Sequence, residues 1–160
     1  MIAPFVCSLC QNGILGGALI VDGEAVTYKT GKVTVSPGLR NLQLGFDEIE
    51  TLDWSGSFIP LATFSMKNGV HYKFLIFNKK RFQTLFERIS RIRHMEALFD
   101  AATKEATEST PDPDTLKQLD DYYKSPLWKE DFAADEAGKL PSNLKRGVLS
   151  EDGLYNILEK

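Results

Sequence analysis

The spacing of hydrophobic residues changes near residue 78. Before that point, apolar residues gather in short runs separated by turn-forming residues, which is typical of strands. After it, they recur at steps of three and four, as in amphipathic helices. The strand-like runs after Ile14 are 15–21, 25–30, 41–46, 49–54, 61–66 and 70–77. The pattern predicts a strand-rich first half and a helical second half.

Turn signals join the predicted strands. Asp22-Gly23 separates the first two runs, and Asn68-Gly69, before the last run, predicts a hairpin turn with positive φ at both central residues. Residues 3–10 alternate weakly and are predicted to form an edge strand. The final run, 70–77, is apolar on both faces, so we predict a central position for it.

A long helix is predicted from its N-cap, Asn78, to about Glu108. Its early apolar positions share one face; they are Phe82, Leu85, Phe86, Ile89 and Ile92. A later set lies roughly a third of a turn away; it contains Met95, Phe99, Ala102 and Ala106. We therefore expect early turns that cover the strands and later turns that receive the C-terminal region, in preference to a kink near Arg93-His94.

Three shorter helices are predicted after the long one. Asp112-Pro113, Ser125-Pro126 and Ser150 are their start signals, because each supplies a side-chain oxygen for the first free N–H groups. Gly138 is predicted to end the second of them. The expected buried positions are Leu116, Leu119 and Tyr123, then Leu127, Trp128 and Phe132, then Leu154, Ile157 and Leu158.

The first half carries four short sequences that together resemble a known fold. They are 17–20 (GALI), 25–28 (AVTY), 44–49 (LGFDEI) and 72–74 (YKF). With their order they resemble a pleckstrin-homology-like domain of the GRAM-type or small bacterial versions, over about residues 14–89. The resemblance implies an α+β fold, in which an antiparallel barrel or bent sheet is capped by the long helix and followed by a small helical module.

Lipid-binding members of that superfamily carry basic residues in the first hairpin loop. This chain has Asp22-Gly23-Glu24 there, which would repel a phosphoinositide headgroup.

The second half has a more specific resemblance, over about residues 88–160. The sequences that carry it are 121–123 (DYY), Trp128, 135–138 (DEAG), 140–141 (LP) and 144–152 (LKRGVLSED). They closely resemble a small bacterial helical domain of unknown function, which implies a fold and a bacterial origin but no activity. We therefore predict a β domain over 1–88 and a helical domain over 89–160 that share the helix 79–108.

Charge is distributed unevenly between these halves. Residues 79–93 contain six basic residues against one acidic residue, and residues 112–136 contain eight acidic against three basic residues. Two interpretations are open. Either both segments are ordinary solvated faces, or the acidic segment folds beside the basic helix and neutralises its charge. Lys79, Lys80 and Arg81 are the candidate surface for an anionic lipid.

Seven residues of the helical region are candidates for a partner surface: Tyr122, Tyr123, Trp128, Asp135, Glu136, Lys145 and Arg146. The two acids and two bases could form a proton-transfer set. Adjacent helical residues point about 100° apart, however, so we favour ion pairs between the acids and the bases that fix the loop 138–147. The three aromatic residues are predicted to be core, with a partner groove as the alternative.

The cysteines do not predict a metal or redox site. Cys7 and Cys10 would point to opposite faces of a strand, and zinc requires four ligands, so we interpret both as structural thiols. The glycines do not form a phosphate loop, and no nucleophile elbow is present. We predict no catalytic residue, cofactor or metal.

Composition narrows the functional classes. A net charge of −3 argues against a nucleic-acid binder, and no apolar run approaches the length that spans a bilayer. The N-terminal residues do not form a secretory signal, and two cysteines fit a reducing cytoplasm. The predicted function is a non-enzymatic, cytoplasmic protein-interaction or scaffold module. Peripheral binding to anionic lipid is the alternative, an enzyme using the acidic and basic tail is a third hypothesis, and homo-oligomerisation is left open.

Overall fold

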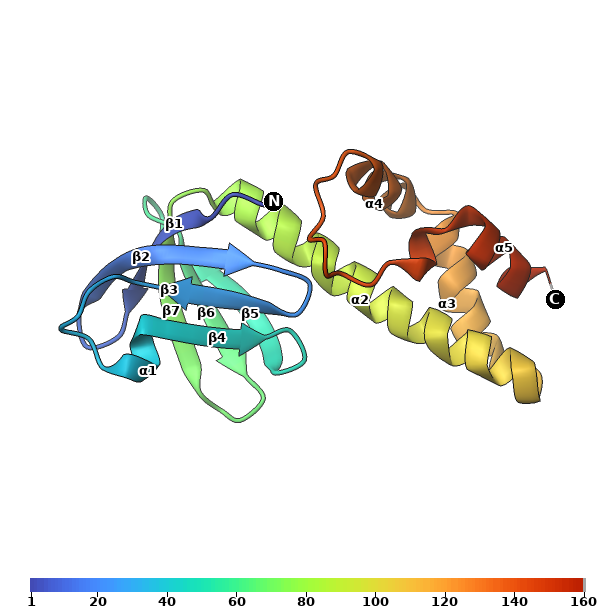
Figure 1. Cartoon of the computed structure of the whole chain (residues 1–160), viewed down its shortest axis with the longest axis horizontal. Helices are drawn as coiled ribbons and strands as arrows, with labels where there is room; N and C mark the ends of the chain where they lie inside the picture. The colour runs from blue at the N-terminus through green and yellow to red at the C-terminus, as the bar shows by residue number, and fades with distance from the viewer. Residues whose placement is uncertain (160) are drawn as a thin grey trace. The chain divides into compact units, whose positions relative to one another are not determined.

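The computed structural model describes residues 1–159, and the chain separates into two compact units. The first contains Met1–Phe86 and Pro141–Asn143, and the second contains Glu87–Leu140 and the chain from Leu144 onward. The fold is α+β: a curled, seven-stranded antiparallel half-barrel is followed in sequence by a helical region (Figure 1). The predicted fold class is therefore confirmed.

The strands of the first unit form one sheet in the order β4-β3-β2-β1-β7-β6-β5, and every neighbouring pair is antiparallel. Their bounds are β1 Phe5–Cys10, β2 Ile14–Val21, β3 Ala25–Lys29, β4 Asn41–Gly45, β5 Ile49–Ser55, β6 Leu61–Met66 and β7 His71–Ile76. A one-turn helix, α1 (Pro37–Arg40), precedes β4.

The predicted edge position of residues 3–10 is wrong. β1 is the middle strand, and it pairs with β2 on one side and β7 on the other. Phe5, Cys7 and Leu9 are all buried, so the strand alternates more strictly than its composition suggested. β7 lies between β1 and β6, and its predicted interior position is confirmed.

The turn at Asn68-Gly69 also differs from the prediction. Only Gly69 has positive φ (86°), and the amide of Gly69 donates to the carbonyl of Met66. Lys67 and Asn68 are therefore the central residues of the turn, and Gly69 follows as a left-handed bulge. The Asn68 side chain contributes by accepting from the amide of Val70 at 3.0 Å.

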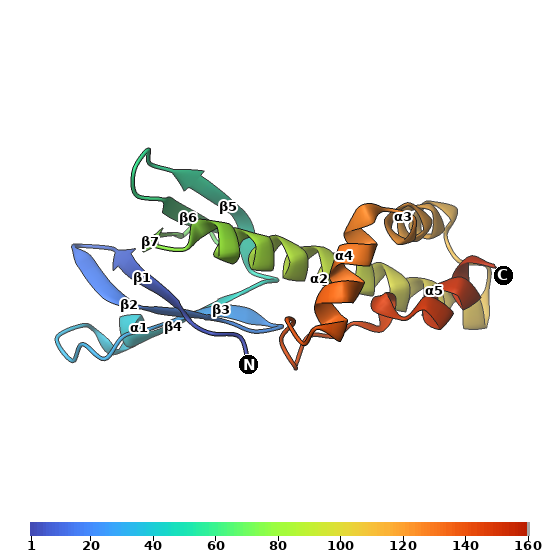
Figure 2. The same cartoon turned by 90° about the horizontal axis from the view of Figure 1, so that it is seen from above.

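The core of the first unit lies on the concave side of the sheet, where the first turns of helix α2 (Lys79–Glu108) enter (Figure 2). Phe82 of α2 is fully buried. Its ring centroid lies 5.1 Å from that of Phe5, 6.2 Å from that of Trp54 and 6.2 Å from that of Phe64. One helical side chain thereby contacts strands β1, β5 and β6.

Helix α2 is one uninterrupted element, as predicted. Asn78 caps it by accepting from the amide of Arg81 at 3.3 Å. The early apolar face is buried from Phe82 to Ile92, and in the later set Ala102 is buried while Met95 and Phe99 are half-buried. Glu96, which continues the line of the early face, is buried as well, so the later turns bury residues on both lines and the predicted second face is confirmed only in part.

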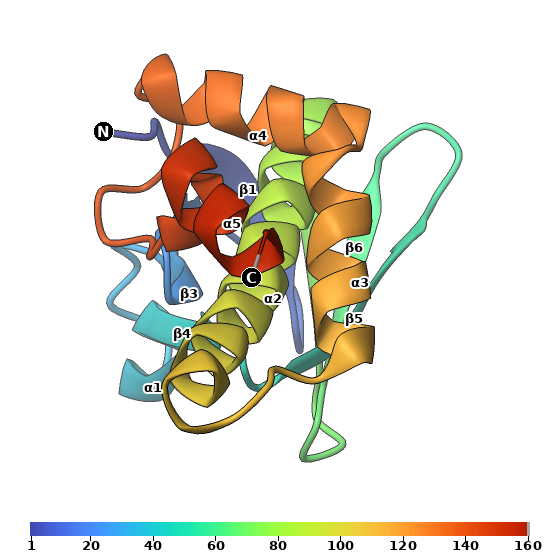
Figure 3. The ribbon, with the colours of Figure 1, turned by 90° about the vertical axis from the view of Figure 1, so that its right-hand side faces the viewer.

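The second unit adds three helices and a 3-10 turn to the later part of α2 (Figure 3). They are α3 (Pro113–Tyr123), α4 (Pro126–Glu136), the 3-10 turn η1 (Gly147–Leu149) and α5 (Glu151–Leu158). Asp112, Ser125 and Ser150 cap α3, α4 and α5 with their side chains, as predicted. Helix α3 packs against both α4 and α5.

The predicted buried positions of the three shorter helices are confirmed in part: Leu119, Trp128, Leu154 and Ile157 are buried, Leu116, Tyr123, Phe132 and Leu158 are half-buried, and Leu127 is exposed. In α3 the buried tyrosine is Tyr122, whereas Tyr123 is half-buried. In α4 Leu127 is 44% exposed, and the inward face carries Asp131 beside Trp128 and Ala134. Asp131 is therefore buried, although the apolar pattern alone would predict that a charged residue at this position is exposed to solvent.

We expect Phe82→Ala to lower the free energy of unfolding by about 3–5 kcal/mol, because it removes a ring that three strands contact. Urea denaturation followed by circular dichroism measures this change. Phe58→Ala is the matched control: its ring is fully exposed, and the expected change is about 0.5 kcal/mol or less. Equal effects of the two substitutions would contradict this account of the core.

Candidate functional site

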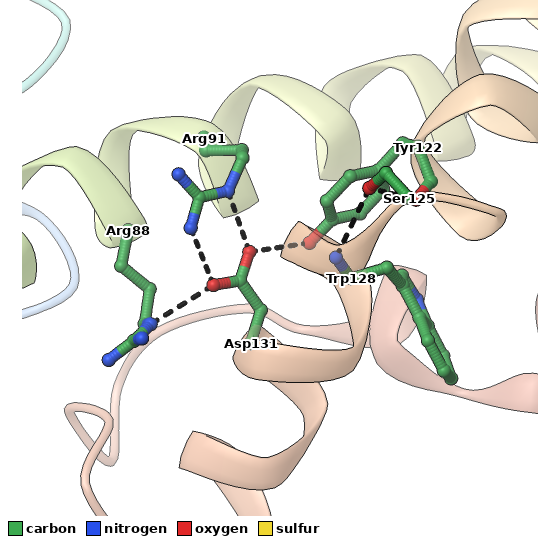
Figure 4. A network of polar contacts seen from close by, with 6 residues as sticks. All are labelled: Arg88, Arg91, Tyr122, Ser125, Trp128 and Asp131. Carbon is green, nitrogen blue, oxygen red and sulfur yellow. Dashed lines mark hydrogen bonds and ion pairs between the residues drawn. The ribbon is translucent and has the colours of Figure 1, made fainter.

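The second unit contains a fully buried carboxylate, Asp131 of α4 (Figure 4). Its Oδ1 accepts from Arg88 Nε at 3.0 Å and from Arg91 Nη2 at 2.6 Å. Its Oδ2 accepts from Arg91 Nε at 2.8 Å and from the Tyr122 hydroxyl at 2.8 Å. Four donors from two other helices therefore surround one carboxylate.

Local sequence brings these groups together. Arg88 and Arg91 are three residues apart on α2, so they lie on the same side of the helix. Asp131 lies on the face of α4 that also buries Trp128 and Ala134, and Tyr122 comes from the last turn of α3. The network joins α2, α3 and α4 through hydrogen bonds to one charge.

The pKa values of two members, Arg91 and Tyr122, are raised, which favours the protonated form of each near neutral pH. The hydrogen bond to Asp131 raises the pKa of Arg91, although burial opposes it. Burial, followed by the charge of Asp131, raises the pKa of Tyr122, so its hydroxyl remains a donor. A carboxylate that accepts four hydrogen bonds is held in one position, and here it joins three helices.

A second buried carboxylate, Glu96 of α2, binds the 3-10 turn. Its Oε2 accepts from the amide of Val148 at 2.7 Å, and the indole N–H of Trp128 donates to the carbonyl of Val148 at 3.1 Å. A Cβ on Gly147 would lie 3.0 Å from Glu96 Oε1, so glycine permits this close approach. Both backbone polar groups of Val148 are thereby satisfied by side chains from α2 and α4.

The predicted pairing of the tail charges is half correct. Arg146 Nη1 lies 2.5 Å from Asp135 Oδ1, as expected. Lys145 instead binds Asp100 of α2, with Nζ 2.6 Å from Oδ1, and lies 3.7 Å from Glu96 Oε1. Its hydrogen bond to Asp100 raises the pKa of Lys145. Glu136 is exposed, so the structure does not bring the four charges into one set.

The three candidate aromatic residues lie in or against the core of the second unit. Tyr122 and Trp128 are buried, and Tyr123 is half-buried. The ring of Tyr123 meets that of Trp128 edge-on, with centroids 5.0 Å apart, and Trp128 stacks on Phe132 at 5.1 Å. Packing accounts for these rings without a partner.

The three basic candidates at the start of α2 are all exposed, and two of them lie over aromatic rings of the strands. Lys79 Nζ lies 5.0 Å from the centroid of the Trp54 ring. The Arg81 guanidinium lies 4.3 Å from the centroid of the Phe5 ring and donates from Nη2 to the Ala3 carbonyl at 2.8 Å. Lys80 is exposed as well.

Residues 86–160 match the model of a family described as a domain of unknown function (DUF4298). The match contains every member of the Asp131 network and Glu96, and it contains none of the strands. No curated protein sequence matches the chain. The DUF4298 match agrees with the predicted resemblance of the C-terminal region to a domain of unknown function.

Neither cysteine lies in a metal cluster. Both are free and belong to β1, where their odd spacing directs them to opposite faces, as predicted. Burial, and secondarily the nearby Cys10, raises the pKa of Cys7 to about 12. Within residues 1–159, no three His, Cys, Asp or Glu side chains are grouped so as to hold a metal ion. Nor does that part of the chain contain a helix long and apolar enough to cross a bilayer.

The sequence-based prediction did not identify Asp131, Arg88 and Arg91 as a set. The residues that it selected were adjacent pairs of charges, whereas the paired groups come from separate helices 40 and 43 positions apart. One signal was present: Glu96 interrupts the apolar line of α2, and a charged residue at a core-facing position requires buried partners.

We expect Asp131→Ala to lower the free energy of unfolding by about 3 kcal/mol or more, because it leaves two guanidinium groups and a hydroxyl without their acceptor. Thermal and urea denaturation measure this loss. Glu130→Ala is the matched control on the exposed side of α4, with an expected change within about 0.5 kcal/mol. A variant Asp131→Ala as stable as the control would show that the network contributes nothing to folding.

The thiols should differ in reactivity at pH 8. Thiolate is the reacting form, and a pKa of about 12 keeps Cys7 protonated at that pH in a buried position. A disulfide reagent that releases a coloured thiolate should therefore label half-buried Cys10 at least about tenfold faster. Cys10→Ser should remove the fast phase and Cys7→Ser should retain it; the opposite assignment would contradict the burial of Cys7.

Proposed function

We propose that this protein is a non-enzymatic interaction module that binds another protein through the outer face of its sheet. The observation that carries this proposal is a row of exposed apolar side chains, formed by Val6 on β1, Phe77 directly after β7 and Ile59 in the loop before β6. Val6 is 67% exposed, Phe77 is 62% exposed and Ile59 is 53% exposed. Exposed apolar residues are common singly, but a contiguous group of them is typical of a binding surface.

The hydrogen bonds of the sheet align this row. The amide of Phe77 donates to the carbonyl of Val6 at 3.4 Å, one step beyond the pair Cys7 and Ile76. The amide of Ile76 donates to the carbonyl of Pro60, which immediately follows Ile59. Since Cys7 and Ile76 are buried, the residues next to them point to the opposite, outer face.

A second row of outward-facing side chains lies two positions from the first: Ser8 after Val6, Leu75 before Phe77 and Leu61 after Ile59. Ser8 of β1 pairs with Leu75 of β7, and Leu75 pairs with Leu61 of β6. These three are half-buried and share the outer face with the first row. We define the outer apolar face as Val6, Ile59, Leu61, Leu75 and Phe77. Phe58, which is fully exposed, adjoins it in the loop between β5 and β6.

Contact rather than catalysis is favoured by the use of the charged residues. The candidate acids and bases of the helical unit, Asp135, Lys145 and Arg146, are held in ion pairs, and the buried Asp131 and Glu96 bind structural donors. The first unit also has seven antiparallel strands followed by a helix that packs on their concave side. That order supports its interpretation as a pleckstrin-homology-like domain, a fold that serves as a binding platform.

Peripheral binding to anionic membranes is the second candidate. It is favoured by the exposure of Lys79, Lys80 and Arg81 just after Phe77 in the sequence. Sedimentation with vesicles of neutral and anionic lipid tests it directly. Binding that requires the anionic lipid and is lost in Lys79→Glu/Lys80→Glu would support it, and the absence of salt-sensitive binding would reject it.

The leading proposal is tested by photo-crosslinking in cells with a benzophenone amino acid at position 6 or 77. Discrete crosslinked proteins are expected from both positions, because both side chains point outward from the apolar face. Position 33 is the matched control, since Val33 is 77% exposed and lies outside the strands. Equal crosslinking from position 33, or none from positions 6 and 77, would overturn the proposal.

A further inference from the structure

The geometry points to a partner segment that presents large apolar side chains flanked by acidic residues to the outer apolar face. This inference rests on the proposed function and specifies the chemistry of the partner. Two properties of the first unit carry it: the shape of the apolar face and the sign of the charges around it.

The shape is set by rigid backbone. Val6, Leu61 and Leu75 belong to strands that are hydrogen-bonded on both sides. Ile59 belongs to a tight loop, in which Gly56 adopts φ 87° and a Cβ on it would lie 2.3 Å from the Ile59 carbonyl oxygen. The apolar side chains are therefore presented in fixed positions, and ordering them on binding costs little conformational entropy.

The charges around this face are mainly basic. Lys73 lies two residues before Leu75 on the same side of β7, and Lys29 pairs with Ala18, which in turn pairs with Val6. Lys80 follows Phe77 closely in the sequence, and all three of these lysines are exposed. Lys79 instead lies over the Trp54 ring, which contacts Phe82. Edge strand β5 carries two exposed acidic residues, Glu50 and Asp53, and Asp53 Oδ2 accepts from the Thr51 hydroxyl.

The basic charges around the outer apolar face favour one of three possible binding partners: an acidic protein segment, a second copy of this chain, or a membrane. Carboxylates beside the apolar residues of a partner would meet ammonium groups on several sides. A second copy docked by the same face would bring lysines toward lysines, because a two-fold interface uses the same patch twice. A membrane is disfavoured because inserting this face would carry the Lys73 ammonium into hydrocarbon, which is costly.

A displayed library of random peptides tests the inference with the full chain as bait. Peptides selected on the wild-type protein should be enriched in large apolar and acidic residues. A synthetic peptide from that selection should bind at least about tenfold more weakly to Val6→Ser/Phe77→Ser, and more weakly at high salt. Val33→Ser is the matched control and should bind like the wild type. Circular dichroism melting establishes that all variants are folded.

The outcomes separate the two proposals. Peptides that require Val6 and Phe77 but are neutral or basic would overturn the acidic partner and leave the proposed function standing. If no selected peptide requires these residues, both proposals fail. Self-association and binding to anionic vesicles are also measured for the wild type and the double variant, because they test a second copy and a membrane as the binding partner. Self-association, or binding to anionic vesicles, that is lost in Val6→Ser/Phe77→Ser would overturn the inference in favour of a second copy or a membrane.

Discussion

The helical period of α2 is the constraint on which both units depend. Thirty residues share one backbone, so the direction of each side chain is fixed by its position in the sequence. Phe82 and Phe86 come to the sheet, and Arg88, Arg91 and Glu96 come to the shorter helices. An inserted or deleted residue within α2 would rotate every later side chain by about 100° relative to the earlier ones. An insertion between Phe82 and Phe86, or between Arg88 and Glu96, would therefore turn one of these side chains out of the core of its own unit.

The two cores are stabilised in different ways. In the first unit the contact between helix and sheet is aromatic, with Phe82 and Phe86 both packed against Phe64. In the second unit the same helix buries Ile89 and Ile92 and adds charges, which must each be satisfied because a buried ion without partners is costly. Asp131 and Glu96 accept hydrogen bonds that are specific in direction. Apolar packing tolerates small shifts, whereas such a network permits one arrangement of its helices.

The sequence predicted those features that depend on local chemistry. Asn78, Asp112, Ser125 and Ser150 each cap a helix, because capping is decided within about four residues. Prediction from the sequence failed where the position of an element depends on residues that are distant in the chain. The weakly alternating residues of β1 gave no sign that β7 pairs with them, and that pairing makes β1 the centre of the sheet.

The candidate site was predicted less well for the same reason. The pairing of Arg146 with Asp135 could be anticipated because both lie near one loop, but Lys145 binds Asp100, 45 positions away. Tyr122 and Tyr123 are adjacent and identical residues, and it is the Tyr122 hydroxyl that donates to Asp131, nine positions away. The outer apolar face was equally hidden, because Val6, Ile59 and Phe77 are neighbours only through the register of the strands.

The chain has two tryptophans, and the fold assigns one to each unit. Trp54 is half-buried on β5 beside Phe82, and Trp128 is buried on α4 with its indole N–H bound to the Val148 carbonyl. Each unit therefore contains its own intrinsic fluorophore in a distinct environment. The emission of the protein is the sum of two optical signals, and single-tryptophan forms would allow the order in which the two units melt to be followed spectroscopically.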